Sequence, residues 1–405
     1  MRPLLFLFFL VALSAFLDTE AARVNDELVA DHTSYFDLQD GKILGADALM
    51  LALQEAHFVA LGELHNRVRL GELTEALLHE LKPLGFSYFA VEVGPHSARR
   101  LQQLIRSGKP SVSALYKKYS SGLFDLIPIP FFAGESDLAF LAAADTLGFE
   151  LWGLDQEFYF SYSFLIDEIA RLAGHSISRE QQRQQRRLVR RLYWLDRRNQ
   201  MAEVLGRNFE RSCRMRSDRE LQDFLTSFSS TDNPDIRQIL DAFHTTLEIY
   251  CLHEQGNAGN TARIQYFKDN FDRQFGYALG ANPEPKVFLK MGSFHMGRWR
   301  SPLNSHDIGN HVHQLAQSRQ QSSVHIYYLN RVLEGRDVTG RPGWEQSMAF
   351  VSVGERARWT LIDLRPLRAR VLYGTLGGSD YELRTIMNYD FIIIVPEDEF
   401  VGRHW

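Results

Sequence analysis

The feature that most constrains the fold of this chain is an alternation of short apolar runs with amphipathic helical patterns. Seven apolar runs of strand length occupy residues 58–61, 88–93, 149–154, 287–289, 324–329, 359–364 and 391–395. Between them, segments such as 69–81 and 136–147 carry leucines on one helical face. Strands that alternate with helices are joined by right-handed crossovers into a parallel sheet. The pattern therefore predicts an α/β fold with a mostly parallel central sheet.

The strand signal stops near residue 161 and returns near residue 281. Long amphipathic stretches at 183–205 and 235–253 replace it. We therefore expect two β/α halves, residues 22–160 and 281–405, that together complete one sheet, and an all-helical insertion over residues 161–280 that forms a cap.

One stretch of the expected insertion, residues 179–198, is rich in arginine. It contains eight Arg, yet Leu188, Leu192 and Leu195 keep one apolar face at helical spacing. Charge runs on helices usually face water. We interpret this stretch as the solvated basic face of a cap helix, with an anion-binding surface as the alternative.

Residues 1–21 have the features of a secretory signal peptide. The apolar run 4–17 follows Arg2 and is shorter than the ~20 residues that a membrane span requires. Thr19 and Ala21 supply small residues before a cleavage after Ala21. We expect an exported protein, periplasmic or extracellular, without a stable membrane span after cleavage; the alternative is an uncleaved N-terminal anchor.

The two cysteines and the charge balance limit the chemistry further. Cys213 and Cys251 can form one disulfide in an oxidising compartment or remain two buried thiols, but they cannot make a four-ligand zinc site. With 45 basic and 50 acidic residues, the net charge of -5 gives no excess positive field for phosphate backbones. The expected partner is a small-molecule or peptide substrate, not a nucleic acid.

Two copies of a Gly-x-x-His turn follow two of the predicted strands. The run 58–61 leads into Gly62 and His65, and the segment 287–291 leads into Gly292 and His295. A glycine at a strand end permits close backbone approach, and ligands of open α/β folds bind at the carboxyl edge of the sheet. We therefore expect both histidines to lie across one cleft at that edge.

Carboxylates are expected at the same edge. Glu63 lies in the first turn, Glu92 belongs to an apolar run where an unpaired carboxylate would be costly, and Asp155 follows a third predicted strand. A histidine held by a carboxylate can act as a general base on water, and a second histidine can bind the developing oxyanion or hold a metal ion. The predicted catalytic residues are Glu63, His65, Glu92 and His295, with Asp155 as a predicted substrate-binding residue.

Other common catalytic motifs do not occur in the sequence. It has no GxSxG elbow, HExxH pair, P-loop or GxGxxG turn, so serine hydrolase, zincin, NTPase and dinucleotide-binding functions have no local support. Four further histidines of the second half are irregularly spaced in a polar context. We expect surface or helix-cap roles for them: His306, His311, His313 and His325.

The first turn and its surroundings resemble a known family. The segment 59–65 (VALGELH), an amphipathic helix, then 84–86 (LGF) and 91–92 (VE) are similar to the start of the erythromycin esterase-like proteins and their relatives in the ChaN, TraB and Tiki superfamily. Arg263, Phe267 and Asn270 resemble a helical Arg, Met, Asn pattern of the esterase-like group. The segments 286–298 and 387–396 resemble its second-half strand and its closing segment, so the resemblance covers most of the chain.

Two details of the turns distinguish branches of this superfamily. Two residues separate Gly62 from His65, as in the ChaN-like and Tiki-like branches, whereas the esterases usually have three. The esterases also tend to carry a His-Asn-x-His turn in the second half, of which this chain retains only the final histidine, His295.

The resemblance implies a hydrolase that cleaves an ester, lactone or peptide bond, with Arg263 as a further substrate-binding residue. In the resembling families the matched residues form either a metal-free water-activating cluster or a divalent metal site. In the second case His65, His295 and Glu92 would be the ligands. The alternative that the resemblance implies is an exported haem-binding or metal-binding protein without catalytic activity.

Overall fold

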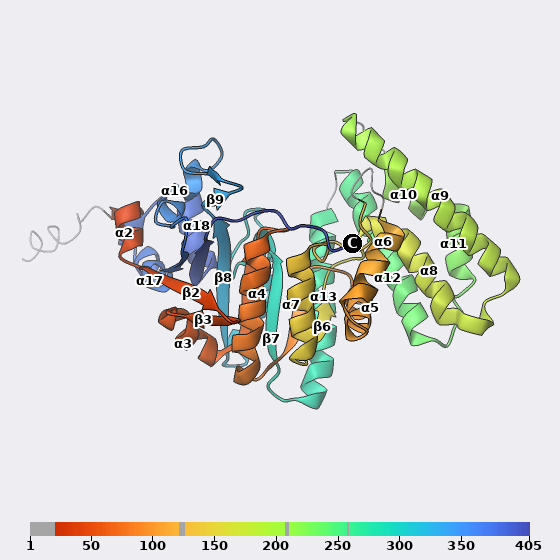
Figure 1. The fold of residues 1–405 in the computed structure, drawn as a ribbon, viewed down its shortest axis with the longest axis horizontal. Helices are drawn as coiled ribbons and strands as arrows, with labels where there is room; N and C mark the ends of the chain where they lie inside the picture. The colour runs from red at the N-terminus through yellow and green to blue at the C-terminus, as the bar shows by residue number, and fades with distance from the viewer. Residues whose placement is uncertain (1–20, 121–125, 207–209, 257–258) are drawn as a thin grey trace, which may run out of the picture.

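Nine strands form the central sheet of the computed structural model, which describes residues 21–120, 126–206, 210–256 and 259–405 (Figure 1). In sheet order they are β3 (Lys42–Leu44), β2 (Thr33–Gln39), β11 (Trp359–Asp363), β13 (Phe391–Val395), β8 (Ser322–Asn330), β4 (Ala56–Glu63), β7 (Lys286–Gly292), β5 (Phe86–Val91) and β6 (Glu150–Gly153). The six strands from β13 to β6 are parallel, and β11, β2 and β3 pair antiparallel at one edge. The predicted α/β fold with a mostly parallel sheet is confirmed.

All seven predicted strands are present, but their order interleaves the two parts of the chain. Strand β7 lies between β4 and β5, and β4 lies between β7 and β8. The early and late segments share one sheet, as the sequence predicted, and their strands interleave within it. Strands β2 and β3 were not predicted, because they lie at an edge where β2 buries only Phe36 and shows no continuous apolar run.

Both faces of the sheet are covered by helices, because alternate side chains of a strand point to opposite faces. In β4, Val59 and Leu61 belong to one apolar core and Phe58 and Ala60 to the other. The first core contains α3 (Asp47–Glu55), α4 (Val68–Leu81), α5 (Pro95–Arg106) and α7 (Glu135–Thr146). The second contains α13 (Gly259–Ala281), α15 (Ile308–Ser318), α17 (Arg365–Leu372) and α18 (Asp380–Asn388).

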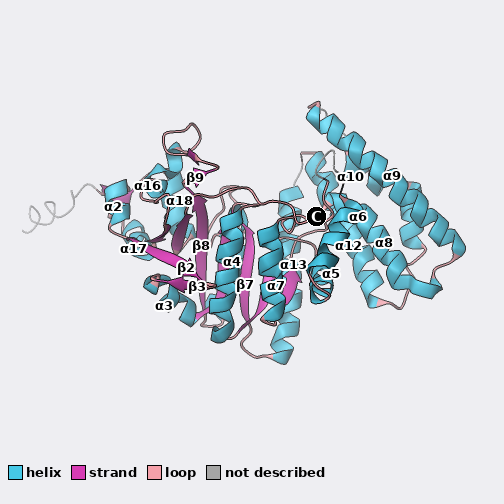
Figure 2. Ribbon diagram, in the orientation of Figure 1, coloured by secondary structure: helices cyan, strands magenta, loops and turns pink. Residues whose placement is uncertain are grey.

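Between β6 and β7 the described residues form only helices, as Figure 2 shows. They are η2 (Tyr159–Ser161), α8 (Tyr162–Ala173), η3 (Gly174–Ser176), α9 (Arg179–Val204), α10 (Arg211–Arg216), α11 (Arg219–Thr226), α12 (Pro234–Glu254) and α13. Helix α13 differs from the rest because it packs on the sheet, with Phe271 and Phe275 against Phe58. Helix α13, which covers one face of the sheet, therefore lies within the predicted insertion of residues 161–280. The domain boundaries stay a prediction.

A disulfide between Cys213 of α10 and Cys251 of α12 joins two of these helices. Of the two alternatives that the sequence left open, a disulfide or two buried thiols, the structure has the disulfide.

The apolar face predicted for the arginine-rich stretch is also confirmed, since Leu188 and Leu192 of α9 are fully buried. None of the helices in the described part of the chain is long and apolar enough to cross a membrane. Residues 1–20 of the predicted signal peptide lie outside the described residues.

Smaller elements connect or flank the sheet. They are β1 (Ala22–Arg23), α2 (Asp26–Ala30), η1 (Lys82–Leu84), α6 (Lys109–Tyr119), α14 (Ser293–Met296), β9 (Val332–Leu333), β10 (Arg336–Asp337), η4 (Glu345–Ser347), α16 (Met348–Val351) and β12 (Leu376–Gly377). Strand β1 pairs in parallel with β12. The short helix α14 directly follows β7 and carries the second histidine of interest.

Candidate active site

The two Gly-x-x-His turns lie side by side at the carboxyl edge of the sheet. Strands β4 and β7 pair in parallel, and Glu63 is the register partner of Gly292. The paired strands therefore end together, and His65 and His295 follow from adjacent positions. Gly292 meets a close approach: a Cβ atom there would lie 3.1 Å from His65 Nε2 and 3.3 Å from Glu92 Oε2.

His65 is held by a buried carboxylate. Its Nδ1 donates to Glu63 Oε1 over 2.8 Å, and the other oxygen of Glu63 forms an ion pair with Lys290 of β7. The imidazole stacks on the ring of Phe131 with 3.9 Å between centroids. Burial lowers the pKa of His65, but the hydrogen bond to Glu63 and the charges of Glu92 and Glu63 outweigh it, so the pKa is raised above 6.5.

His295 has the same kind of support from a different carboxylate. Its Nδ1 donates to Asp307 Oδ2 over 2.8 Å, and Asp307 is the N-cap residue of α15. The edge of its ring packs against Phe267. Burial lowers the pKa of His295, but the hydrogen bond to Asp307 and the charge of Glu92 outweigh it, so this pKa is also raised.

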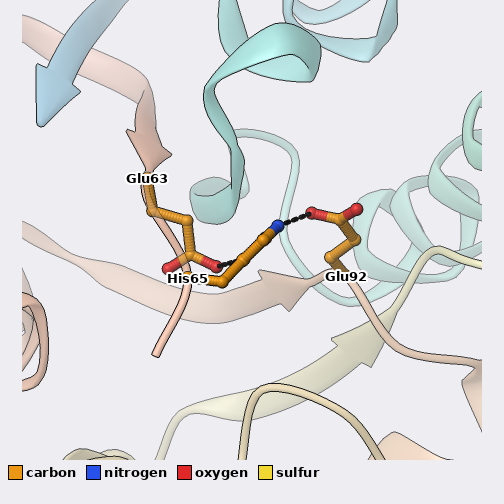
Figure 3. Close-up of side chains that lie close together, drawn as sticks. All are labelled: Glu63, His65 and Glu92. Carbon is orange, nitrogen blue, oxygen red and sulfur yellow. Dashed lines mark hydrogen bonds and ion pairs between the residues drawn. The ribbon is translucent and has the colours of Figure 1, made fainter. Parts of the chain in front are cut away.

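Glu92 lies between the two histidines, just after β5. Its Oε2 is 3.8 Å from His65 Nε2, and its Oε1 is 3.7 Å from His295 Nε2. Figure 3 shows Glu63, His65 and Glu92 in a row, with the imidazole between the carboxylates. Burial raises the pKa of Glu92, but the charges of His65, His295 and Arg263 and the N–H of Gly292 lower it to about 2. Glu92 is therefore ionised at neutral pH.

Arg263 of α13 ties the site to the helical region. Its Nη2 is 2.7 Å from Glu92 Oε1 and 2.6 Å from Asp155 Oδ2, and its Nε donates to Asp155 Oδ1 over 3.0 Å. Asp155 follows β6 at the same sheet edge, as the sequence predicted. Burial of Asp155 raises its pKa even though Arg263 opposes the shift.

A cavity of about 240 Å³ opens beside this cluster. Arg263 and Asp155 line it together with Phe131, which stacks on His65. Its remaining walls come from Pro130, from Gln156 and Phe158, and from the adjoining ends of α12 and α13, including Tyr250 and Asn260. A ligand in this cavity would therefore lie between the sheet edge and the helical region.

The donor set fits a divalent metal ion poorly. Glu63, His65 and Glu92 each offer a ligand atom, and these atoms lie within 4.8 Å of one another; this group contains Glu63 in place of the predicted ligand His295. Each carboxylate already has a cation, Lys290 for Glu63 and Arg263 for Glu92. A divalent ion would add positive charge beside two cations that the same carboxylates hold.

The structure brings all six predicted site residues together: Glu63, His65, Glu92, Asp155, Arg263 and His295. Their catalytic and binding roles stay predictions. Sequence reasoning missed Asp307, Lys290 and Phe131. Lys290 had a visible signal, since a charged residue interrupts the apolar strand β7, whereas Asp307 and Phe131 lie in segments without a distinctive pattern.

One expectation about the other histidines was wrong. His325 lies in β8 and is fully buried, not at the surface or at a helix cap. Its Nδ1 is hydrogen-bonded to the carbonyl of Met296 at the end of α14, so it supports the segment that carries His295. Burial lowers the pKa of His325 to about 3, which keeps it neutral.

At the level of sequence, no family model and no curated protein matches this chain. Solved structures do match. A variant of the erythromycin esterase EreC in its open conformation has a TM-score of 0.56 at 15% identity, covering 91% of this chain and 98% of that one. A protein from Bacillus cereus has a TM-score of 0.55 at 13% identity, covering 94% and 100%. A succinoglycan biosynthesis protein has a TM-score of 0.53 at 12% identity, covering 93% and 98%. The resemblance predicted from the sequence is thus confirmed for the fold: this chain has an erythromycin esterase-like fold.

Proposed function

We propose that this protein is a hydrolase that cleaves an ester, lactone or peptide bond of a small substrate bound in the cavity beside Arg263. One observation carries the proposal. Each imidazole has its Nδ1 bonded to a buried carboxylate, and each Nε2 faces Glu92 across a gap of 3.7 to 3.8 Å. Such a gap is too long for a direct hydrogen bond, and a water at the side of the gap can contact Glu92 and an imidazole Nε2 together.

His65 suits the role of general base. An ionised carboxylate can only accept hydrogen bonds, so Glu63 fixes the proton of neutral His65 on Nδ1 and leaves Nε2 as the acceptor. The side chain of His65 is 31% exposed, against 8% for His295, so His65 is the histidine that water and substrate reach. As water attacks the substrate carbonyl, Nε2 takes its proton and Glu63 stabilises the imidazolium.

His295 and Arg263 suit the stabilisation of negative charge. Asp307 holds the Nδ1 proton of His295, so that in the protonated ring Nε2–H faces the site and can donate to the oxyanion of the tetrahedral intermediate and then to the leaving group. Arg263 lines the cavity and can orient the carbonyl of the substrate. Glu92 holds the attacking water and keeps both imidazoles oriented.

The test is a panel of nitrophenyl esters, aliphatic lactones and a fluorogenic peptide, assayed with and without EDTA. Hydrolysis of at least one class that survives EDTA and disappears in His65→Asn supports the proposal. Equal turnover by wild type and His65→Asn would overturn it. EDTA-sensitive turnover that Zn²⁺ restores would overturn the metal-free use of the cluster.

We also propose that the protein is exported. The disulfide between Cys213 and Cys251 supports this, since disulfides persist in oxidising compartments. The apolar run 4–17 supports it as well. Fractionation of cells that express the tagged chain, with N-terminal sequencing of the product, tests both export and cleavage after Ala21.

The haem-binding alternative stays a prediction. Titration with haem tests it, and a Soret shift at one haem per chain would support it.

A further inference from the structure

Helix α9 borders the helical region on the side away from the sheet (Figure 1). Its inner side packs through Leu188 and Leu192, which are fully buried. The opposite side has a composition unlike the rest of the surface. At about 100° per residue, nine positions of α9 fall within one arc of about 100°, and we call them the α9 outer face: Arg179, Arg183, Arg186, Arg190, Tyr193, Trp194, Arg197, Met201 and Val204.

The C-terminal end of this face is strongly apolar and exposed. Trp194 is 63% exposed and Val204 is 76% exposed, and Leu205 directly after the helix is 60% exposed. Five of the fourteen exposed large apolar side chains of the described residues lie within residues 193–205. A gathering of this kind on a soluble domain marks a surface that contacts a partner.

The N-terminal part of the face is positively charged. Along the flank of α9, Arg187 and Arg191 are paired with Glu220 and Asp218 of the neighbouring chain segment. Within the described residues, by contrast, no acidic side chain lies at ion-pair distance from Arg186 or Arg190, and both are exposed. No position of the α9 outer face is acidic. The face therefore complements a negatively charged partner.

We propose that the α9 outer face docks on the surface of an anionic phospholipid bilayer. Arginines next to exposed Trp and Tyr are the composition of helices that lie in a membrane interface, where guanidinium groups bind lipid phosphates and aromatic rings enter the headgroup region. The face is the convex side of one helix, which suits a broad lipid surface better than a protein that inserts into a groove. The whole chain has a net charge of -5, whereas the α9 outer face is positively charged. An anionic bilayer would therefore attract this face and repel much of the remaining surface, so the protein would dock in one orientation.

The test is co-sedimentation of the full-length protein with vesicles of phosphatidylglycerol and phosphatidylcholine, compared with phosphatidylcholine alone. Removing two basic residues near the surface costs about 1 kcal/mol each, so Arg186→Gln with Arg190→Gln is expected to lower the partition coefficient by about 25-fold. Trp194→Ala with Val204→Ser is expected to weaken binding at high salt, where only apolar insertion remains. The control is Arg219→Gln on α11, which removes one exposed positive charge outside the α9 outer face.

All variants keep the same N-terminus, so residues 1–21 contribute equally and differences report on α9. Near-ultraviolet and far-ultraviolet spectra that match those of wild type exclude misfolding as the cause of a loss. Three results would overturn the proposal. The variant with Arg186→Gln and Arg190→Gln could bind vesicles as tightly as wild type, or wild type could bind equally well with and without phosphatidylglycerol. The protein could also form a concentration-dependent dimer that the same substitutions abolish. The last result would assign the face to a second copy of the chain.

Discussion

The carboxylate of Glu92 accepts a hydrogen bond of 2.6 Å from the backbone N–H of Gly292, which lies 200 residues later in the chain. This bond joins the ends of β5 and β7, which are neighbours in the sheet. It holds Glu92 where both oxygens face a histidine, one from each Gly-x-x-His turn. The site thus depends on two distant parts of the chain at once.

Replacing His65 is expected to remove activity without removing the fold. The change His65→Ala takes away the general base, which contributes on the order of 10²- to 10⁴-fold in rate. The ring is 31% exposed at a strand end, so the change in the free energy of unfolding should be small. Turnover of the best panel substrate and a urea titration measure both effects. His311→Ala, which alters a surface pair with Asp272, is the control and should keep full activity.

The two histidines are expected to act as a unit. If His65 and His295 share one water and one carboxylate, the double change to Ala should lower kcat/KM scarcely more than either single change. Independent roles would instead multiply the two losses. Kinetics of the wild type, both single variants and the double variant with one substrate decide between the two outcomes.

The pH dependence of kcat/KM should have an acid limb above the usual histidine pKa of 6.5. His65 must be neutral to accept a proton, and its pKa is raised, so activity falls as the pH drops through that raised value. Glu63→Gln removes a negative charge and a charged hydrogen-bond acceptor that raise this pKa. The acid limb of the variant should therefore move to lower pH. A limb that stays in place would mean that another group titrates.

Arg263 is expected to be important for stability as well as for binding. Arg263→Met leaves Glu92 and Asp155 as buried carboxylates without their shared cation, a change that typically costs about 3 to 5 kcal/mol. Adding Asp155→Asn should recover part of this loss, because one of the uncompensated charges disappears. Chemical denaturation of the single and double variants at pH 7 measures the recovery. A double variant less stable than Arg263→Met would contradict the charge argument.

Reduction of the disulfide is expected to lower the melting temperature. Cys213 and Cys251 are 38 residues apart, and closing a loop of this length stabilises the folded state by about 3 to 4 kcal/mol in the chain-entropy model. Melting with and without dithiothreitol measures the shift, and the Cys213→Ser, Cys251→Ser variant should melt at the reduced value in both buffers. Two titratable thiols in the denatured, unreduced protein would show that the bridge is absent in solution.

The sequence by itself determined seven of the nine strands of the central sheet and the residues that gather at the candidate site. Buried parallel strands are continuous apolar runs, so β4 and β13 were recognisable without any tertiary information, and a glycine followed by a histidine at two strand ends identified His65 and His295. The edge strands β2 and β3 were not predicted, because a half-exposed strand has no continuous apolar run.

Only the tertiary structure decided the order of the strands and the partners of each side chain. Pairing of β7 between β4 and β5 depends on which distant apolar surfaces fit together, and local patterns carry no information about that choice. The same pairing brings Lys290 to Glu63, and the packing of α14 and α15 brings Asp307 to His295. Asp307 raises the pKa of His295, and Glu63 raises the pKa of His65 against the opposing charge of Lys290, since a buried charge acts strongly only on the groups that folding places beside it.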